Sequence, residues 1–108
     1  MPERKYAAPS AAPLEVDRLI HEPARLNLMA ILYVIDSADF TFLMAQTGLS
    51  WGNLSSHMTR LEEAGYIAVE KEFKGRRPNT MLKLTDSGRE AFRKYRRSMK
   101  DILDDLPD

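Results

Sequence analysis

Two helical patterns in the middle of the chain are separated by very little sequence. The first, residues 37–48, has Thr41 as its expected N-cap and ends at Gly48, which suits the left-handed conformation that terminates a helix. The second starts after Ser50, a typical N-cap, so only Leu49 stands between the two ends. Helices joined this closely must cross sharply. The pattern therefore predicts a helix-turn-helix.

The second of these helices, expected over about residues 50–64, is built from weak helix formers in its first turns. Leu54, Met58 and Leu61 share one stripe that faces inward, and the outer arc is left with small, hydrogen-bonding side chains. Such a slim face suits the DNA major groove, where Asn pairs with adenine and Arg with guanine. The predicted contact residues are Ser50, Gly52, Asn53, Ser55, Ser56, Thr59 and Arg60.

A two-residue period follows the helix and predicts a β-hairpin. YIAVEKEF (66–73) alternates between two faces, KGRRPN (74–79) is rich in turn residues, and TMLKLT (80–85) returns as a second strand. Arginines on a protruding tip can enter a minor groove or hold phosphates, although a solubilising turn is a common alternative. The predicted wing contacts are Lys74, Arg76, Arg77 and Asn79.

The flanking helices predict a dimer. LEVDRLI (14–20) reads as a short helix, residues 24–35 are apolar nearly all round, and Thr85 caps a long helix over 86–106 with apolar residues spaced 3, 4, 3 and 4. A helix packed on its own domain is the alternative to this short coiled-coil seam. The predicted dimer-interface residues are Leu26, Met29, Tyr33, Phe92, Tyr95, Met99, Ile102 and Leu106.

Length and composition limit the classes of protein that are open. A chain of 108 residues supports one domain, and the Pro-rich stretch 1–13 reads as a flexible arm ahead of a DNA-binding domain (14–85) and a dimerisation helix (86–108). There is no cysteine, no apolar run long enough for a membrane and no signal peptide, so we expect a cytoplasmic protein.

The formal net charge of zero hides an uneven distribution. Residues 51–100 hold twelve Lys/Arg and six Asp/Glu, whereas DILDDLPD (101–108) holds four acids and no cation. A localised basic region is what a polyanionic partner needs, although charge alone does not distinguish it from a solvated helix face.

No constellation for catalysis or metal binding emerges. Ser55, Ser56 and His57 are neighbours on one helix and point apart, so they cannot form a triad. His21 and His57 lack the short spacing of metal ligands. The sequence predicts neither an enzyme nor a cofactor. A half-buried structural role for His57 is as well supported as contact with a phosphate. Trp51 is interpreted as a packing anchor for the turn.

The segments LIHEPARLNLMAIL (19–32) and GLSWGN to GREAF (48–92) resemble the compact winged-helix transcriptional regulators of bacteria and archaea, relatives of the MarR and ArsR types. The resemblance covers about residues 19–95, and the helix–hairpin segment with LTDSGREAF after it is highly specific. It implies a cytoplasmic homodimer that binds DNA sequence-specifically, with the second helix of the motif in the major groove and the hairpin as wing. ArsR relatives often sense metals through cysteines, which this chain lacks.

The predicted fold class is mainly α with a two-stranded β-hairpin wing (α+β), a winged helix-turn-helix with a long C-terminal helix used for dimerisation. The leading hypothesis is a dimeric regulator of transcription that binds double-stranded DNA. The alternative is a protein-interaction module of the same fold that never meets DNA. A third hypothesis adds an unidentified small-molecule effector, with four aromatic candidates to line its cavity: Tyr33, Phe40, Phe42 and Trp51.

Overall fold

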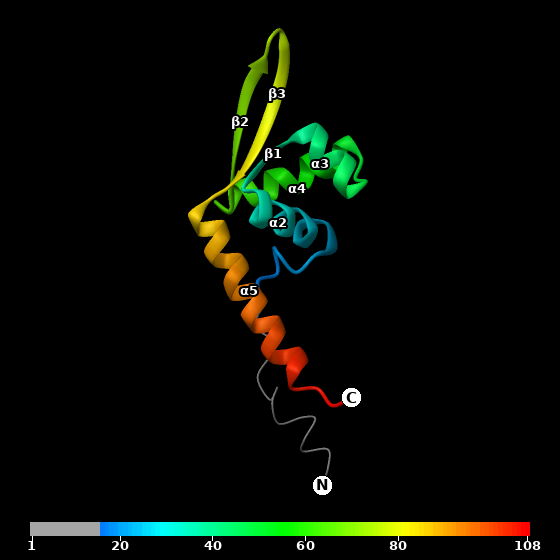
Figure 1. Cartoon of the computed structure of the whole chain (residues 1–108), viewed down its shortest axis with the longest axis vertical. Helices are drawn as coiled ribbons and strands as arrows, with labels where there is room; N and C mark the ends of the chain where they lie inside the picture. Colours follow the sequence, from blue (N-terminus) through cyan, green and yellow to red (C-terminus); the bar gives the residue numbers. More distant parts are fainter. Residues whose placement is uncertain (1–15) are drawn as a thin grey trace.

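The computed structural model describes residues 16–108 as helices around a small sheet (Figure 1). The predicted arm, 1–13, lies outside the described residues. The elements in chain order are α2 (Pro23–Ile35), β1 (Ser37–Asp39), α3 (Phe40–Thr47), α4 (Trp51–Glu63), β2 (Ile67–Lys74), β3 (Arg77–Leu84) and α5 (Asp86–Asp104).

The sheet has three antiparallel strands in the order β1-β3-β2. The hairpin is confirmed, and its strands run from the pair Ile67 and Leu84 to the pair Lys74 and Arg77. The short strand β1, which the sequence did not predict, adds to the other edge of β3 by pairing Ser37–Asp39 with residues 81–83. The base of the wing is therefore stabilised by pairing with β1, and the part of the hairpin towards the tip is not paired with β1.

The two caps that define the helix-turn-helix are confirmed. Gly48 ends α3 in the left-handed conformation (φ 72°), and the Ser50 side chain accepts a hydrogen bond from the Asn53 amide at 3.1 Å. The prediction of Thr41 as the first cap is wrong. Asp39 accepts from the Phe42 amide at 2.7 Å, and the helix begins two residues earlier than expected because β1 delivers the chain to that point.

One hydrophobic core lies between the sheet and the helices. Leu54 and Leu61 of α4 are fully buried in it, and Met58 packs against it, as their spacing predicted. The long helix α5 contributes Phe92 and Tyr95 to the same core.

This packing corrects part of the predicted dimer interface. Met29 has no exposed surface, and Phe92 and Tyr95 are each 6% exposed, all within one protomer. Their burial therefore needs no second subunit. For these residues, the alternative interpretation of packing on their own domain is the correct one. Leu26, Tyr33, Met99 and Ile102 are half-buried, and Leu106 is exposed.

The predicted helix over 14–20 is wrong for its described part. Residues 18–20 form a single turn, because the Asp17 carboxylate accepts hydrogen bonds from the amides of Leu19 and Ile20. Such local capture by an Asp side chain competes with helix formation. The turn leads into Glu22, which caps α2 by accepting from the Arg25 amide at 2.8 Å. That hydrogen bond from the backbone lowers the pKa of Glu22.

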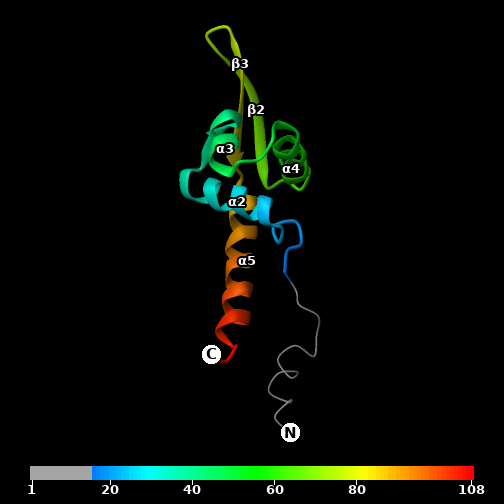
Figure 2. The same ribbon diagram turned by 90° about the vertical axis from the view of Figure 1, so that its right-hand side faces the viewer.

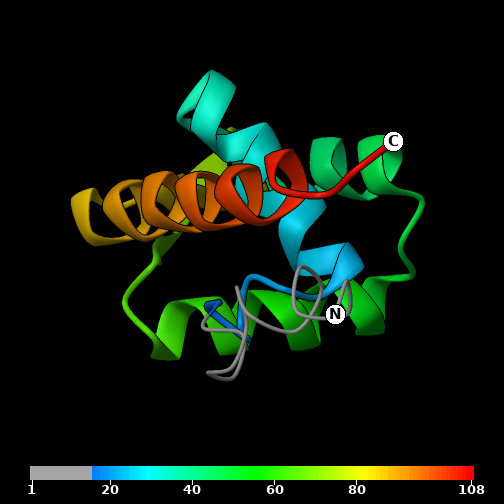
Figure 3. The ribbon, with the colours of Figure 1, turned by 90° about the horizontal axis from the view of Figure 1, so that it is seen from below.

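The hairpin and α5 extend in opposite directions from the body of the molecule. The wing projects beyond α3 and α4 at one end, and the last turns of α5 project at the other (Figure 1 and Figure 2). Seen from below, α5 crosses over α2, with which it packs (Figure 3). In the described part of the chain, none of the helices combines the length and the apolar character that a membrane crossing requires.

Candidate nucleic-acid interface

The outer face of α4 is open to solvent along its whole length. Six of its seven predicted contact residues are exposed, and Ser55 is half-buried because it faces the hairpin. The first turn of α4 carries no acid. Since the N-terminal end of a helix bears a partial positive charge, this face is suited to phosphates. The exposed members are Ser50, Gly52, Asn53, Ser56, Thr59 and Arg60.

Some of these polar groups are already engaged within the helix. The Ser50 hydroxyl accepts from the Asn53 amide, and the Thr59 hydroxyl donates to the Ser55 carbonyl oxygen at 3.0 Å. The side chains of Asn53 and Arg60 form no hydrogen bond to other residues in the described range. The amide group of Asn53 and the guanidinium group of Arg60 are therefore free to bind a partner.

The wing ends in a tighter turn than the sequence indicated. Only Gly75 and Arg76 lie in the turn, with Gly75 at φ 64°, and β3 already begins at Arg77. The broad loop predicted over 74–79 is therefore wrong in its extent. Arg76 and Arg77 are exposed at this tip.

The other two predicted wing residues have partners. Lys74 lies 3.5 Å from an oxygen of Asp39, the residue that caps α3, and both groups keep solvent contact. Asn79 lies in β3 and donates to the Glu72 carboxylate across the hairpin at 3.2 Å. Of the predicted wing contacts, Arg76 and Arg77 are thus the two cations that have no ion-pair partner among the described residues.

A groove of about 260 Å³ joins α4 to the stem of the hairpin. Trp51, Ser55 and Met58 line one wall, and β2 and β3 line the other with Lys71 and Asn79 among them. Helix α4 and the wing are therefore parts of one continuous surface.

Trp51 was read as a packing anchor, and the structure supports this only in part. Its ring lies 5.8 Å from that of Phe40, yet the residue is 66% exposed beside the first turn of α4. The sequence could not show this exposure, because it depends on how far the hairpin stem stands from the helix.

A polar cluster behind α4, which the sequence did not reveal, fixes the helix to α2. The buried Arg25 donates to the Leu19 carbonyl oxygen at 2.6 Å and lies 3.0 Å from His57 Nδ1. Glu22 lies 4.0 Å from the same ring nitrogen. His57 therefore has a half-buried structural role, and only the proximity of residues distant in sequence could identify its partners.

The open helix, the braced basic hairpin and the groove between them define a winged-helix DNA-binding protein. The chain belongs to the family described as winged helix DNA-binding domain, whose model matches residues 24–103. This confirms the predicted fold class and the family resemblance.

Individual relatives agree with the family. An uncharacterised protein of Methanocaldococcus jannaschii is 32% identical over 78 residues, which is 72% of this chain and 85% of that protein. The structure of a transcriptional regulator homologue from Pyrococcus horikoshii OT3 superposes with a TM-score of 0.77 at 30% identity and 96% coverage of both chains.

More distant structures share the fold. NadR, crystallised in complex with 4-hydroxyphenylacetate, gives a TM-score of 0.66 at 22% identity over 81% of this chain and 64% of that one. The family and its regulator homologue make the chain a DNA-binding regulator, which confirms that it is not an enzyme.

Proposed function

We propose that the protein is a homodimeric transcription regulator that binds double-stranded DNA sequence-specifically, with α4 in the major groove and the hairpin tip on the minor groove or backbone. The observation that carries the proposal is the continuous surface in which the acid-free start of α4 faces the stem of a hairpin with two free arginines at its tip. The chromosome of a bacterium or archaeon lies in the cytoplasm, where we expect the protein to act.

Each part of this surface has a chemical role in the proposal. Asn53 and Arg60 can read base edges, because their amide and guanidinium groups pair bidentately with adenine and guanine. Arg76 and Arg77 supply sequence-independent attraction to phosphates and position the duplex. The short side chains Gly52 and Ser56 allow α4 to approach the groove floor closely.

Selection of bound sequences from a random DNA pool, followed by affinity measurements on the selected site, tests the proposal. We expect Arg76→Ala/Arg77→Ala to weaken binding to all sequences and to reduce the slope of log K against log salt by about 1.8, since each phosphate contact contributes about 0.9. Asn53→Ala should instead reduce discrimination among sequences by about 1–3 kcal/mol at one base position.

The matched control removes two exposed cations that lie away from the tip. Arg18→Ala/Lys83→Ala makes the same change in net charge and should leave most of the salt slope intact. Equal losses in the two double variants would remove the wing from the proposal. Failure of the parent protein to shift any duplex at micromolar concentration would favour a protein-docking module.

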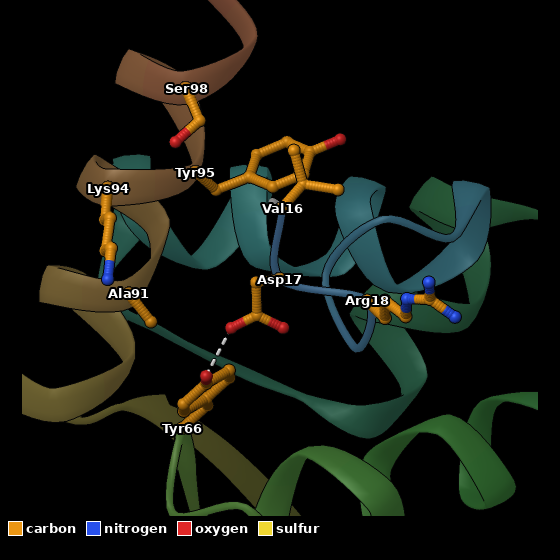
Figure 4. Close-up of a pocket in the computed structure, with 8 residues that line it drawn as sticks. All are labelled: Val16, Asp17, Arg18, Tyr66, Ala91, Lys94, Tyr95 and Ser98. Carbon is orange, nitrogen blue, oxygen red and sulfur yellow. Dashed lines mark hydrogen bonds between the residues drawn. The ribbon is translucent and has the colours of Figure 1, made fainter. Parts of the chain in front are cut away.

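We also propose a small-molecule effector, in a cavity other than the one expected from the sequence. The four aromatic candidates do not line one cavity: Tyr33 lies beside the arginines of α5, Phe40 and Trp51 line the groove at the hairpin, and Phe42 is 43% exposed. A cavity of about 630 Å³ lies instead between the segment 16–18, Tyr66 and α5 (Figure 4).

The lining of this cavity holds two cations, Arg18 and Lys94, and one acid, Asp17, whose carboxylate already accepts hydrogen bonds from Tyr66 and from the amides of Leu19 and Ile20. This balance suits an amphipathic anion. The aromatic ring of Tyr95 and the methyl group of Ala91 provide apolar surface, and Lys94 provides a cation, all from α5 (Figure 4). Tyr66 stands between the end of α4 and the start of β2, so a ligand here would touch the junction of both proposed DNA-contacting elements. NadR, a protein of the same fold, has been crystallised with 4-hydroxyphenylacetate.

Thermal unfolding in the presence of a panel of aromatic carboxylates tests the effector site. A ligand of this class should raise Tm, since binding to the folded state stabilises it, and should change DNA affinity. Lys94→Ala should abolish both effects, and Lys83→Ala, a change of the same charge at an exposed residue outside the cavity and outside α5, should preserve them. If the panel leaves Tm and DNA affinity unchanged, this ligand class is excluded.

A further inference from the structure

The side of the hairpin that packs on the core continues beyond the core towards the tip. Residues directly opposite each other in an antiparallel pair share a side, and every second pair lies on the same side. Ile67 and Val69 of β2 contact the core, together with their partners in β3. The next two pairs on that side are Lys71 with Thr80 and Phe73 with Pro78. All of these four except Phe73 line the groove beside α4, so this side of the hairpin faces that helix.

The last of these pairs is apolar and open to solvent. Phe73 is 71% exposed, and Pro78 is exposed as well. The part of the hairpin that carries them projects beyond α3 and α4 (Figure 1 and Figure 2), so none of the described elements covers them. A partner that lies along this side of the hairpin, between its tip and α4, would bury both side chains.

The charges around the pair indicate the chemistry of that partner. Residues 71–77 hold four cations and one acid. The acid, Glu72, lies on the other side of the hairpin, where its carboxylate accepts a hydrogen bond from Asn79 at 3.2 Å. Arg76 and Arg77 are exposed at the tip, next to the apolar pair. An apolar pair bordered by cations suits duplex DNA, which combines anionic phosphates with the apolar faces of its bases.

Phe and Pro are among the side chains that can enter a minor groove and insert between neighbouring base pairs. Insertion unstacks the step and bends the duplex, and the contacts that the bend permits repay its cost. Arginines beside the inserted ring can hold the phosphates on either side of the step. Pyrimidine–purine steps such as TA and CA unstack most readily, so a wedge of this kind favours them without a hydrogen bond to any base.

We propose that Phe73, supported by Pro78, is an apolar wedge that inserts into the minor groove beside the sequence contacted by α4, unstacks one base step and bends the duplex. The proposal rests on the DNA binding proposed above. It adds a contribution from the deformability of the DNA to the hydrogen bonds and charges of the other contacts. The preferred sites should therefore contain a pyrimidine–purine step that no polar side chain reads.

Fluorescence of 2-aminopurine tests the insertion, because this adenine analogue is quenched in the base stack and brightens when it is unstacked. The analogue replaces one base at a time on both strands of the duplex that the full chain selects. Binding of the parent should raise the fluorescence at least about threefold at one step beside the α4 sequence. Phe73→Ala should abolish this rise, and Phe73→Leu, which keeps an apolar wedge, should preserve most of it.

Substitution of the step in the DNA tests the resulting preference. Replacing the pyrimidine–purine step by a stiff AA step should weaken binding of the parent at least about tenfold, and binding of Phe73→Ala less than about twofold. Met81→Ala removes an apolar side chain from the other side of the same hairpin and is the matched control, expected to behave as the parent in both experiments. Thermal unfolding verifies that each variant is folded.

The outcomes distinguish the wedge from the DNA binding on which it rests. A parent protein that shifts no duplex would overturn both. A parent that binds its selected site without a rise in fluorescence at any position, or with a rise that Phe73→Ala retains, would leave DNA binding standing and overturn the wedge. Weaker binding of Phe73→Ala to every duplex, with the step preference unchanged, would also overturn it and place Phe73 against the sugars instead.

Discussion

At the scale of the residue, Tyr66 joins three parts of the molecule. Its amide donates to the Leu61 carbonyl oxygen at 3.0 Å, its own carbonyl oxygen accepts from the Thr85 amide at 3.1 Å, and its hydroxyl donates to the Asp17 carboxylate. Burial, followed by the effect of Asp17, raises the pKa of Tyr66 to about 12. One side chain therefore ties the segment before α2 to the junction of α4 and the wing.

Tyr66→Phe should reduce the free energy of unfolding at pH 7 by about 1–2 kcal/mol, as it removes a hydrogen bond to a charged group. Because the pKa is raised above the value of about 10 in unfolded chains, the parent's stabilisation is complete below pH 10 and is lost as pH rises through 12. Urea unfolding from pH 7 to 11.5 should show a smaller alkaline decline for Tyr66→Phe. Tyr33→Phe, whose tyrosine has a lowered pKa, should not reproduce this change.

Gly88 is the second residue on which the same junction depends. A Cβ at this position of α5 would lie 2.1 Å from the Tyr66 carbonyl oxygen, a backbone atom that cannot rotate away. Gly88→Ala should therefore lower the free energy of unfolding by at least about 2 kcal/mol, despite the gain of about 1 kcal/mol in helix propensity. A parent-like Tm in thermal unfolding would contradict this close approach.

At the scale of the element, the small residues that keep the outer face of α4 accessible also lower the stability of the helix. A Cβ at Gly52 would have no atom within 4 Å, so Gly52→Ala should raise the free energy of unfolding by about 0.5 kcal/mol through helix propensity alone. The added methyl group should nevertheless weaken DNA binding, because it thickens the face proposed to enter the groove. Urea unfolding and binding to the selected site measure the two effects, and a gain in both would contradict the role of Gly52.

The elements that sequence could predict are those whose signals are local. The caps at Gly48 and Ser50 and the inward stripe of α4 were correct because a few neighbouring residues determine them. Strand β1 was missed because three residues hold no recognisable alternation, and it forms only through pairing with β3. The start of α3 shifted to Asp39 for the same reason.

The residues of the candidate site also divide into those that local sequence signals predict and those that depend on contacts between distant parts of the chain. The outward residues of α4 and the arginines of the tip follow from periodicity and turn chemistry. The exposure of Trp51, the contact of Arg25 with His57 and the pairing of Lys74 with Asp39 depend on residues far apart in the chain. Which apolar residues of α5 belong to the core, and which remain for a partner, also depends on the packing of the whole protomer. Phe92, predicted at the dimer interface, is buried in the core.

At the scale of the whole molecule, we expect α5 to join the two protomers of the proposed homodimer and so to fix the distance between their DNA-binding surfaces. Phe92 and Tyr95 anchor the helix in the core of each protomer, and its last turns project away from that body (Figure 2). Half-sites one turn of duplex DNA apart, about 34 Å, require the two surfaces to be held at that distance.

Changing the spacing of the two half-sites tests whether this distance is rigid. Insertion of 5 bp rotates one half-site to the opposite side of the duplex, and insertion of 10 bp restores its direction but adds about 34 Å. A dimer joined by packed helices cannot follow either change, so both DNAs should bind at least tenfold more weakly and approach the affinity of a single half-site. Recovery of full affinity with the 10 bp insertion would mean that the two halves are joined flexibly, and α5 would then not be the spacer.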